Sequence, residues 1–233
     1  MLIRGIIFDL DNTLCNYNES AINGRVAVFE YLKTKYPHLT DELLKKAFHD
    51  SSVAALKEYM TGELNERKRQ VRRFYLFLKY LNLDKKEDPV FLRSLYYEKG
   101  IEHLKLYDGV RETLATLKSR FKLALLTNGL VDLQNQKLDK IGIRNFFDCI
   151  IISEEVGIDK PNPKIFEVVL DCLGLKREEV IYVGDDPPFD IVGAKNAGIK
   201  VVWFNPKNKA LPPQYPKPDF EIQKIKDLLK IVL

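Results

Sequence analysis

The sequence predicts an α/β protein with a Rossmann-like parallel sheet, helices on both faces of that sheet, and an inserted all-helical domain. From residue 107 onward, short apolar runs alternate with helical stretches, which is typical of a parallel sheet covered on both faces. Residues 16–105 show only helical spacing, and the apolar run at residues 5–10 before them supplies the first strand. We therefore expect a core formed by residues 1–15 and 106–233, interrupted by a helical domain over residues 16–105.

The strands and helices of the core follow from the residue types in each run. Short apolar runs, often β-branched, predict strands at 5–10, 121–127, 149–153, 180–184 and 200–204. Stretches with apolar residues at three- and four-residue spacing predict helices at 110–119, 131–142, 163–174 and 190–198. A proline-rich connection over 205–219 precedes a last short strand and helix.

The inserted segment has its own helix signals. Helical spacing runs through 27–36, 40–48 and 53–60, with Thr40 as an expected N-cap, and Asp88 followed by Pro89 predicts a further helix start. The clearest pattern lies at 65–83, where the expected buried face consists of Val71, Phe74, Tyr75, Leu78 and Leu81. The basic residues at the start of that helix, residues 67–73, are interpreted as a solvated face.

Composition narrows the class of protein. The 233 residues are 45% hydrophobic, which is ample for a packed core, and no apolar run resembles a secretory signal or a membrane span. A cytoplasmic location without membrane contact is therefore expected. The three cysteines, Cys15, Cys149 and Cys172, are widely spaced among apolar neighbours, so buried reduced thiols are expected rather than a disulfide.

The net charge of +4 lies in the inserted segment. Residues 16–105 hold 17 Lys and Arg against 13 Asp and Glu, whereas the rest of the chain is balanced. The only basic run, ERKRQVRR at 66–73, lacks paired aromatic residues on an exposed side, so no nucleic-acid partner is expected. The positive excess instead favours small anionic substrates.

Polar clusters follow three of the predicted core strands. They consist of Asp9, Asp11 and Thr13, then Thr127, Asn128 and Gly129, and finally Asp185, Asp186 and Asp190. Because ligands of open α/β sheets bind beyond the carboxyl ends of the strands, the three clusters should face one crevice. Lys160, just ahead of a proline-rich helix start, would add a single cation there.

The first cluster poses an electrostatic problem. If Asp9 and Asp11 continue the strand, their side chains share one side, and carboxylates about 5 Å apart repel by roughly 3 kcal/mol at an effective dielectric of about 20. Either one carboxyl group holds a proton or a cation sits between the two. Both answers indicate chemistry rather than packing.

These motifs resemble those of the haloacid dehalogenase superfamily of phosphohydrolases, in the subfamily with a helical cap inserted after the first strand. DLDNT at 9–13 resembles the first motif, LLTNG at 125–129 the second, the lysine of DKPNP at 159–163 the third, and GDDPPFD at 184–190 with the following AKNAG the fourth. The resemblance covers essentially the whole chain, and the four motifs occur in order.

The resemblance implies a Mg²⁺-dependent phosphomonoester hydrolase acting on a small phosphorylated metabolite. Asp9 would be the nucleophile that becomes an aspartyl-phosphate, and Asp11 would give and take the proton. Mg²⁺ would be held by Asp9, Asp185 and the main-chain carbonyl of Asp11. The phosphoryl group would be bound by Thr127, Asn128, Gly129 and Lys160, with Asp190, Asp186 and Thr13 in support. Asp186 stands where related proteins often carry a small hydroxyl residue, so capping of the next turn is its alternative role.

Two rival interpretations remain at this stage. The resemblance also includes 2-haloacid dehalogenases, which lack the second aspartate and use no metal; Asp11 and the acidic 184–190 segment argue against them. A non-catalytic protein that binds a phosphorylated metabolite is the rival from another class, although every expected catalytic position is filled. The sequence names neither the substrate nor the oligomeric state, monomer or homodimer, and a packing role is expected for Cys15.

Overall fold

The computed structural model describes residues 2–233 and shows a six-stranded parallel sheet in the order β3-β2-β1-β4-β5-β6. The strands are β1 (Gly5–Phe8), β2 (Lys122–Thr127), β3 (Cys149–Ile152), β4 (Val180–Gly184), β5 (Lys200–Phe204) and β6 (Phe220–Ile222). The predicted fold class is confirmed. Because β1 lies between β2 and β4, the ends of the three strands that carry the polar clusters are neighbours.

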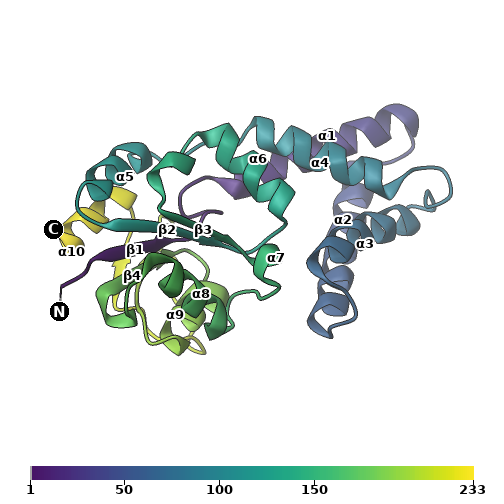
Figure 1. The fold of residues 1–233 in the computed structure, drawn as a ribbon. Coiled ribbons are helices and arrows are strands. Elements are labelled where there is room, and N and C mark those ends of the chain that lie inside the picture. Colours follow the sequence, from purple (N-terminus) through teal and green to yellow (C-terminus); the bar gives the residue numbers. More distant parts are fainter. Residues whose placement is uncertain (1) are drawn as a thin grey trace. The chain divides into compact units, whose positions relative to one another are not determined.

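Helices cover both faces of this sheet, as Figure 1 shows. On one face lie α5 (Val110–Lys118) and α6 (Val131–Ile141), and on the other α8 (Pro163–Leu173) and α9 (Val192–Asn196). Alternate strand residues supply the two hydrophobic layers: Ile6 and Phe8 of β1 pack on the α5 side, and Ile7 packs on the α8 side. This double burial explains why the strands are continuous apolar runs.

Short elements join these layers. They include α7 (Ser153–Val156), a π-helical turn over Pro187–Ile191, 3₁₀ turns at Arg144–Phe146, Arg177–Glu179 and Ile225–Leu228, and α10 (Leu229–Val232) at the end of the chain. The sequence predicted one helix from 190 to 198; the structure instead has the π-helical turn followed by α9. The two prolines at 187–188 start that turn, which brings Asp190 back to the strand end.

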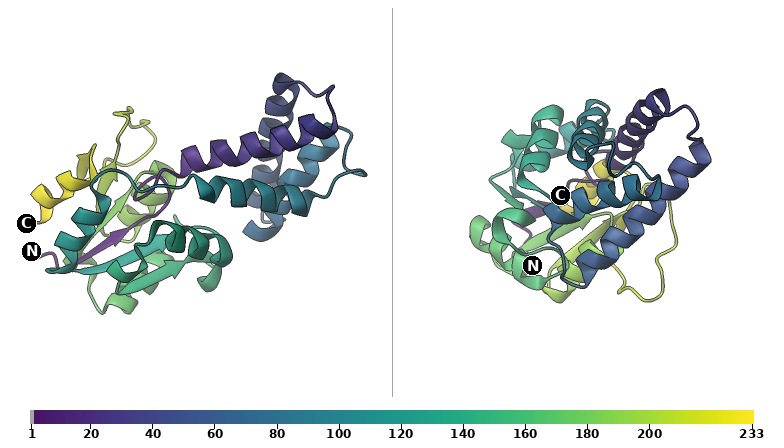
Figure 2. Two further views of the ribbon diagram at one scale, coloured as in Figure 1. Left: turned by 90° about the horizontal axis from the view of Figure 1, so that it is seen from above. Right: turned by 90° about the vertical axis from the view of Figure 1, so that its right-hand side faces the viewer.

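The chain divides into two compact units, Met1–Tyr17 with Leu104–Leu233, and Asn18–His103. Each junction lies two residues inside the predicted insertion of 16–105. The second unit is built from α1 (Tyr17–Lys35), α2 (Asp41–Met60), α3 (Glu66–Tyr80) and α4 (Pro89–Glu102), and we refer to it as the cap. In Figure 2, α1 and α4 run side by side in both views. A Cβ atom at Gly24 of α1 would lie 2.2 Å from the Tyr96 carbonyl oxygen, so glycine permits this close approach.

Within the cap, the predicted helix starts at Thr40 and Asp88 are confirmed, and the predicted buried face of α3 is corrected. Thr40 and Asp88 accept hydrogen bonds from the Leu43 and Val90 N–H groups, as N-caps do. In α3, however, Phe77 is fully buried whereas Val71 and Tyr75 are only half-buried. The ring of Phe77 packs on the rings of Phe29 and Phe48. Because of this aromatic cluster, the buried face of α3 is shifted from the predicted face toward Phe77.

The interpretation of residues 67–73 as a wholly solvated face also needs correction. Arg69 pairs with Glu66, Arg72 pairs with Glu58, and the Arg73 guanidinium lies 4.8 Å from the ring centroids of both Phe74 and Tyr96. Arg69, Arg72 and Arg73 therefore take part in packing within the cap, whereas Arg67 and Lys68 are exposed as predicted. Among residues 2–233, no helix is long and apolar enough to span a membrane.

The expectation of three reduced cysteines is wrong for two of them. Cys149, at the start of β3, and Cys172, on α8, form a disulfide with a Cα–Cα distance of 6.2 Å. The two elements pack against each other in the same hydrophobic layer, which brings together residues 23 positions apart. Cys15 is a free and fully buried thiol whose Sγ lies 3.5 Å from the Leu10 carbonyl oxygen.

We predict that breaking the Cys149–Cys172 bond lowers the free energy of unfolding by about 3 kcal/mol, because the loop it closes becomes free in the unfolded chain. Urea unfolding of the Cys149→Ala/Cys172→Ala double variant would measure the loss. Dithiothreitol should lower wild-type stability similarly and leave the double variant unchanged. Three titratable thiols in denatured, unreduced wild type would contradict the assignment.

Candidate active site

The predicted site residues meet at the carboxyl edge of the sheet. Asp9 directly follows β1, Thr127 is the last residue of β2, and Asp185 directly follows β4. The Asp9 N–H donates to the Val183 carbonyl at 2.9 Å, which ties the end of β1 to β4. Lys160 reaches the same edge from the loop between α7 and α8, and the peptide bond between Lys160 and Pro161 is cis.

Lys160 is the central cation of the site. Its side chain is only 3% exposed, and Nζ lies 2.6 Å from Asp9 Oδ1, 2.7 Å from Asp190 Oδ1 and 2.9 Å from the Tyr182 hydroxyl oxygen. Burial works to lower the pKa of Lys160, but Asp190 and Asp9 outweigh it and raise that pKa above its usual value. Lys160 is therefore a permanent cation with all its donors engaged.

Asp190 supports this lysine and has no carboxylate oxygen to spare. Its Oδ1 accepts from Lys160 and from the Tyr182 hydroxyl, while Oδ2 accepts from the Asp186 N–H at 2.9 Å. A Cβ atom at Gly184 would lie 2.4 Å from the Asp190 carboxyl carbon, so only glycine lets the carboxylate pack against the end of β4. The expected support role of Asp190 thus has a structural basis.

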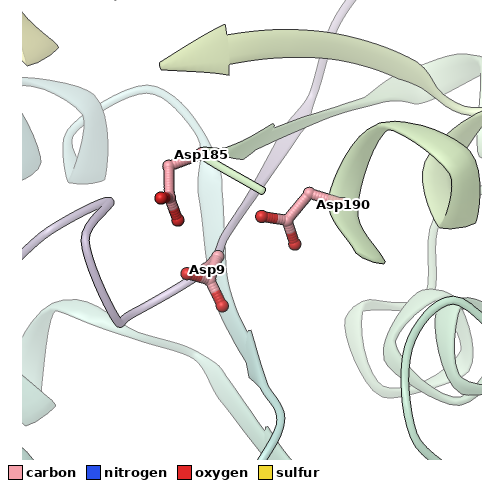
Figure 3. Close-up of side chains that lie close together, drawn as sticks. All are labelled: Asp9, Asp185 and Asp190. Carbon is pink, nitrogen blue, oxygen red and sulfur yellow. The ribbon is translucent and has the colours of Figure 1, made fainter. Parts of the chain in front are cut away.

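The acidic groups exceed the single cation that faces them. Oxygen atoms of Asp9, Asp185 and Asp190 lie within 4.8 Å of one another, and Figure 3 shows the three side chains close together. Burial raises the pKa of Asp9 to about 7, with Lys160 opposing and Asp190 adding to the effect. Burial and the charge of Asp9 raise the pKa of Asp185 to about 9. This excess of negative charge suits a bound divalent cation.

Asp9 and Asp185 are better placed than Asp190 to hold that cation. Both oxygens of Asp190 already accept hydrogen bonds, two of them on Oδ1, whereas Asp9 Oδ2 and the side chain of Asp185 face each other across the Thr13 hydroxyl. Thr13 Oγ1 lies 3.2 Å from Asp9 Oδ2 and 3.4 Å from Asp185 Oδ1. The Trp203 indole N–H donates to the main-chain carbonyl of Asp185 at 3.0 Å and fixes the backbone of this residue. All-oxygen donors of this kind fit Mg²⁺.

Asp11 does not share its surroundings with Asp9, contrary to the strand-alternation argument. β1 ends at Phe8 and a turn over residues 12–14, with Asn12 at a positive φ of 63°, follows shortly after, so Asp9 and Asp11 do not continue the strand. Asp11 Oδ2 instead pairs with Lys137 Nζ at 2.6 Å. The charge that adds most to the raised pKa of Asp9 is Asp190, and Asp11 contributes less. The carboxylates that mainly repel one another are therefore those of Asp9, Asp185 and Asp190, and not those of Asp9 and Asp11 as predicted.

The expected phosphate-binding residues lie together after β2. The Thr127 hydroxyl accepts from Gln134 Nε2 at 2.6 Å and donates to the Asn128 carbonyl at 3.4 Å, a partner that it would exchange for a phosphoryl oxygen. The Asn128 side chain clamps the Lys160 backbone, accepting from its N–H at 2.9 Å and donating to its carbonyl at 3.0 Å. The Gly129 N–H donates to Ser153 Oγ at 3.1 Å, so it would have to exchange this partner to bind phosphate.

Asp186 contributes mainly through its backbone. Its N–H binds Asp190 and its carbonyl accepts from the Asp190 N–H at 2.7 Å, whereas its side chain makes no capping hydrogen bond. Burial and the nearby Asp190 raise the pKa of the Asp186 side chain to about 6.

Sequence reasoning missed Gln134, Lys137 and Tyr182. Gln134 and Lys137 occupy positions i and i+3 of a buried α6 stripe that continues with Leu138 and Ile141, and all four residues are buried. Polar residues within an apolar stripe were the available signal. Tyr182 lies in β4 on the side that faces α8, where its phenol ring packs 5.2 Å from the Phe166 ring centroid. A hydroxyl inside an otherwise apolar strand run could have indicated its buried partners.

Comparison with known proteins agrees with this geometry. The sequence profile of the family described as haloacid dehalogenase-like hydrolase matches residues 6–204, which is most of the chain. The chain belongs to this family. The recognition drawn from the four motifs is thereby confirmed.

Relatives of this family member extend over its full length. A glyceraldehyde 3-phosphate phosphatase from Methanopyrus kandleri is 33% identical, and the match covers 99% of this chain and 97% of the relative. The pyrophosphatase PpaX from Halalkalibacterium halodurans is 32% identical, covering 100% and 98%. Among solved structures, the hydrolase YfnB of Bacillus subtilis, bound to magnesium, aligns with a TM-score of 0.82 at 26% identity and covers 100% of this chain and 99% of its own.

We predict that Tyr182→Phe lowers kcat by about 10-fold, because Lys160 and Asp190 lose a buried hydrogen-bonding partner worth about 1.5 kcal/mol. The fold should persist, since the ring keeps its contact with Phe166. Steady-state kinetics and a thermal melt would measure both quantities. Tyr215→Phe, in the connection before β6, is the matched control; an equal loss of kcat there would contradict the role of Tyr182.

Proposed function

We propose that this protein is a Mg²⁺-dependent phosphomonoester hydrolase that acts on a small phosphorylated metabolite through an aspartyl-phosphate at Asp9. The observation that carries the proposal is the position of Asp9, whose carboxylate is held by Lys160 on one oxygen and faces Asp185 with the other. The relatives support it, because proteins alike over the full length are named as phosphatases. A cytoplasmic location is part of the same proposal.

The residues present fit Mg²⁺. Asp9 and Asp185 would supply carboxylate oxygens, and Asp11 its main-chain carbonyl. The bound ion would offset the charge of the phosphoryl group and so let a carboxylate approach it. The support for this assignment is geometric, because oxygens of Asp9, Asp185 and Asp190 lie within 4.8 Å of one another; burial, and next to it the neighbouring carboxylates, raise the pKa of Asp9 and of Asp185.

The chain's own residues then divide the reaction into two displacements. In the first, an Asp9 oxygen forms a bond to phosphorus, the bond to the leaving oxygen breaks, and Asp11 gives its proton to that oxygen. In the second, a water oxygen attacks phosphorus, Asp11 takes the water proton, and the Asp9–phosphorus bond breaks. The Thr127 hydroxyl holds a phosphoryl oxygen during both steps, and Lys160 holds another by exchanging one of its three present partners for it.

The two rivals fit the site less well. A dehalogenase of this fold needs neither a second aspartate nor a metal, and here Asp11 is held by two side chains while Asp185 adds a charge that needs compensation. A non-catalytic binding protein would have no use for a buried nucleophile beside a charged lysine. The phosphatase is therefore the proposal that uses every group at the strand ends.

Substrate choice is assigned to the cap. None of the site residues falls within Asn18–His103, so the cap can vary the leaving group it accepts without altering the chemistry. The relatives are named for chemically different phosphate compounds, including glyceraldehyde 3-phosphate and an N-acylneuraminate 9-phosphate. A panel of phosphomonoesters ranked by kcat/KM with Mg²⁺ would identify the class.

We predict that Asp9→Asn and Asp11→Asn fail at different steps. Asp9→Asn removes the nucleophile, so neither turnover nor a phosphoenzyme should be seen with any substrate. Asp11→Asn should slow an alkyl phosphate by about 10²- to 10⁴-fold, the usual worth of general acid catalysis. It should still be phosphorylated by p-nitrophenyl phosphate, whose leaving group departs without a proton.

Mass spectrometry after rapid quench would locate the adduct on the peptide that contains Asp9. Asp171→Asn, an exposed carboxyl group on α8, serves as the control and should match wild type. Substantial turnover by Asp9→Asn, or equal loss of the adduct in both variants with the aryl substrate, would overturn the assignment of nucleophile and acid.

A further inference from the structure

Helix α6 brings a second buried cation to the site: Lys137 pairs with Asp11, whereas Lys160 pairs with Asp9. Lys137 is only 4% exposed, and a lysine is almost never fully buried unless it is paired. Desolvating its ammonium group is costly, so its position calls for a specific partner. That partner is the carboxylate proposed to move the proton.

Three contacts fix Lys137 and Asp11 relative to each other. Lys137 Nζ lies 2.6 Å from Asp11 Oδ2 and 3.8 Å from the ring centroid of Tyr17, so the ammonium group sits between a carboxylate and an aromatic face. Gln134 Nε2 lies 3.3 Å from the same Asp11 oxygen and also donates to Thr127 and to the Asn128 carbonyl. One oxygen of Asp11 is therefore anchored twice.

The other oxygen of Asp11 is different. Oδ1 is shielded from solvent and has no hydrogen-bonding partner among residues 2–233. A buried carboxylate oxygen without a partner costs free energy unless it is used in another state of the molecule. An acid–base group needs this asymmetry, because one oxygen must be held while the other exchanges a proton.

We propose that Lys137 is a positioning residue for the acid–base carboxylate: it anchors Asp11 Oδ2 and thereby leaves Oδ1 as the oxygen that exchanges the proton. In the first step the proton passes from Oδ1 to the leaving oxygen, and in the second it passes from water to Oδ1. Lys137 takes no part in the proton transfer itself. The inference rests on the proposed function, since it presupposes that Asp11 is the acid and base.

A purely structural role makes a different prediction. If the Lys137–Asp11 pair only fastened α6 to the loop after β1, its loss would affect every substrate alike and would add to the effect of losing Asp11. A positioning role acts through Asp11 alone. The effect of removing the pair on the rate should therefore depend on how much the leaving group needs a proton, and this effect should vanish once Asp11 cannot carry a proton.

The test uses Lys137→Met, which keeps the length of the side chain and removes its charge, with phenyl phosphate and p-nitrophenyl phosphate as substrates. We expect kcat/KM for phenyl phosphate to fall by about 10- to 100-fold, part of the usual worth of general acid catalysis, and that for p-nitrophenyl phosphate to fall by less than about 3-fold. Lys137→Arg should recover most of the loss. Lys140→Met, an exposed lysine on the same helix, should match wild type.

In the Asp11→Asn background, Lys137→Met should lower the rate by less than about 2-fold further. Equal losses on both substrates, additivity with Asp11→Asn, or a wild-type rate for Lys137→Met would each overturn the inference. If Lys137→Met does not fold, as judged by its thermal melt, Lys137→Gln is measured against the same criteria. If wild type hydrolyses no phosphomonoester or Asp11→Asn behaves like wild type, the proposed function fails instead.

Discussion

The ion pair between Lys160 and the two aspartates at its tip is the interaction on which the site depends. Its ammonium group joins the end of β1, through Asp9, to the turn after β4, through Asp190. A buried charge is tolerated only when it is paired and hydrogen-bonded, and every donor of Lys160 has a partner. Gly184, Tyr182 and the clamp of Asn128 on the lysine backbone serve to keep this pairing in place.

One lysine does not balance the carboxylates gathered around it. Asp185 stands beside Asp9 and Asp190 without a cation of its own, which is why burial and these neighbours raise its pKa to about 9. The same excess of carboxylates over cations makes the site suitable for Mg²⁺. Within it, Lys160 holds Asp9 where Asp9 can attack a phosphoryl group. Binding and chemistry thus come from a single arrangement of charge, whereas Asp11 has its own partners on α6 and can act on the proton independently.

Much of this arrangement could be predicted from the sequence, because parallel strands end at one edge and the polar clusters follow β1, β2 and β4. What could not be predicted depended on contacts between distant residues. The disulfide joins Cys149 to Cys172 only because β3 packs on α8. Lys137 and Tyr182 lie inside apolar patterns that predict burial but not the partner. β1 ends at Phe8, before either aspartate, so the alternation rule placed Asp11 beside the wrong neighbour.

Thermal unfolding with and without Mg²⁺ tests the central claim that excess negative charge at the strand ends is relieved by a divalent cation. Wild type should be stabilised by about 2.7 kcal/mol at a Mg²⁺ concentration a hundredfold above Kd. Near pH 7, Asp185→Asn should be more stable than metal-free wild type, because a carboxyl group whose pKa is raised to about 9 must take up a proton on folding and an amide need not; the variant should also lose the response to Mg²⁺. The exposed Asp171→Asn should keep the wild-type response. A wild-type melt independent of Mg²⁺, or an Asp185→Asn protein that responds as wild type does, would contradict the account.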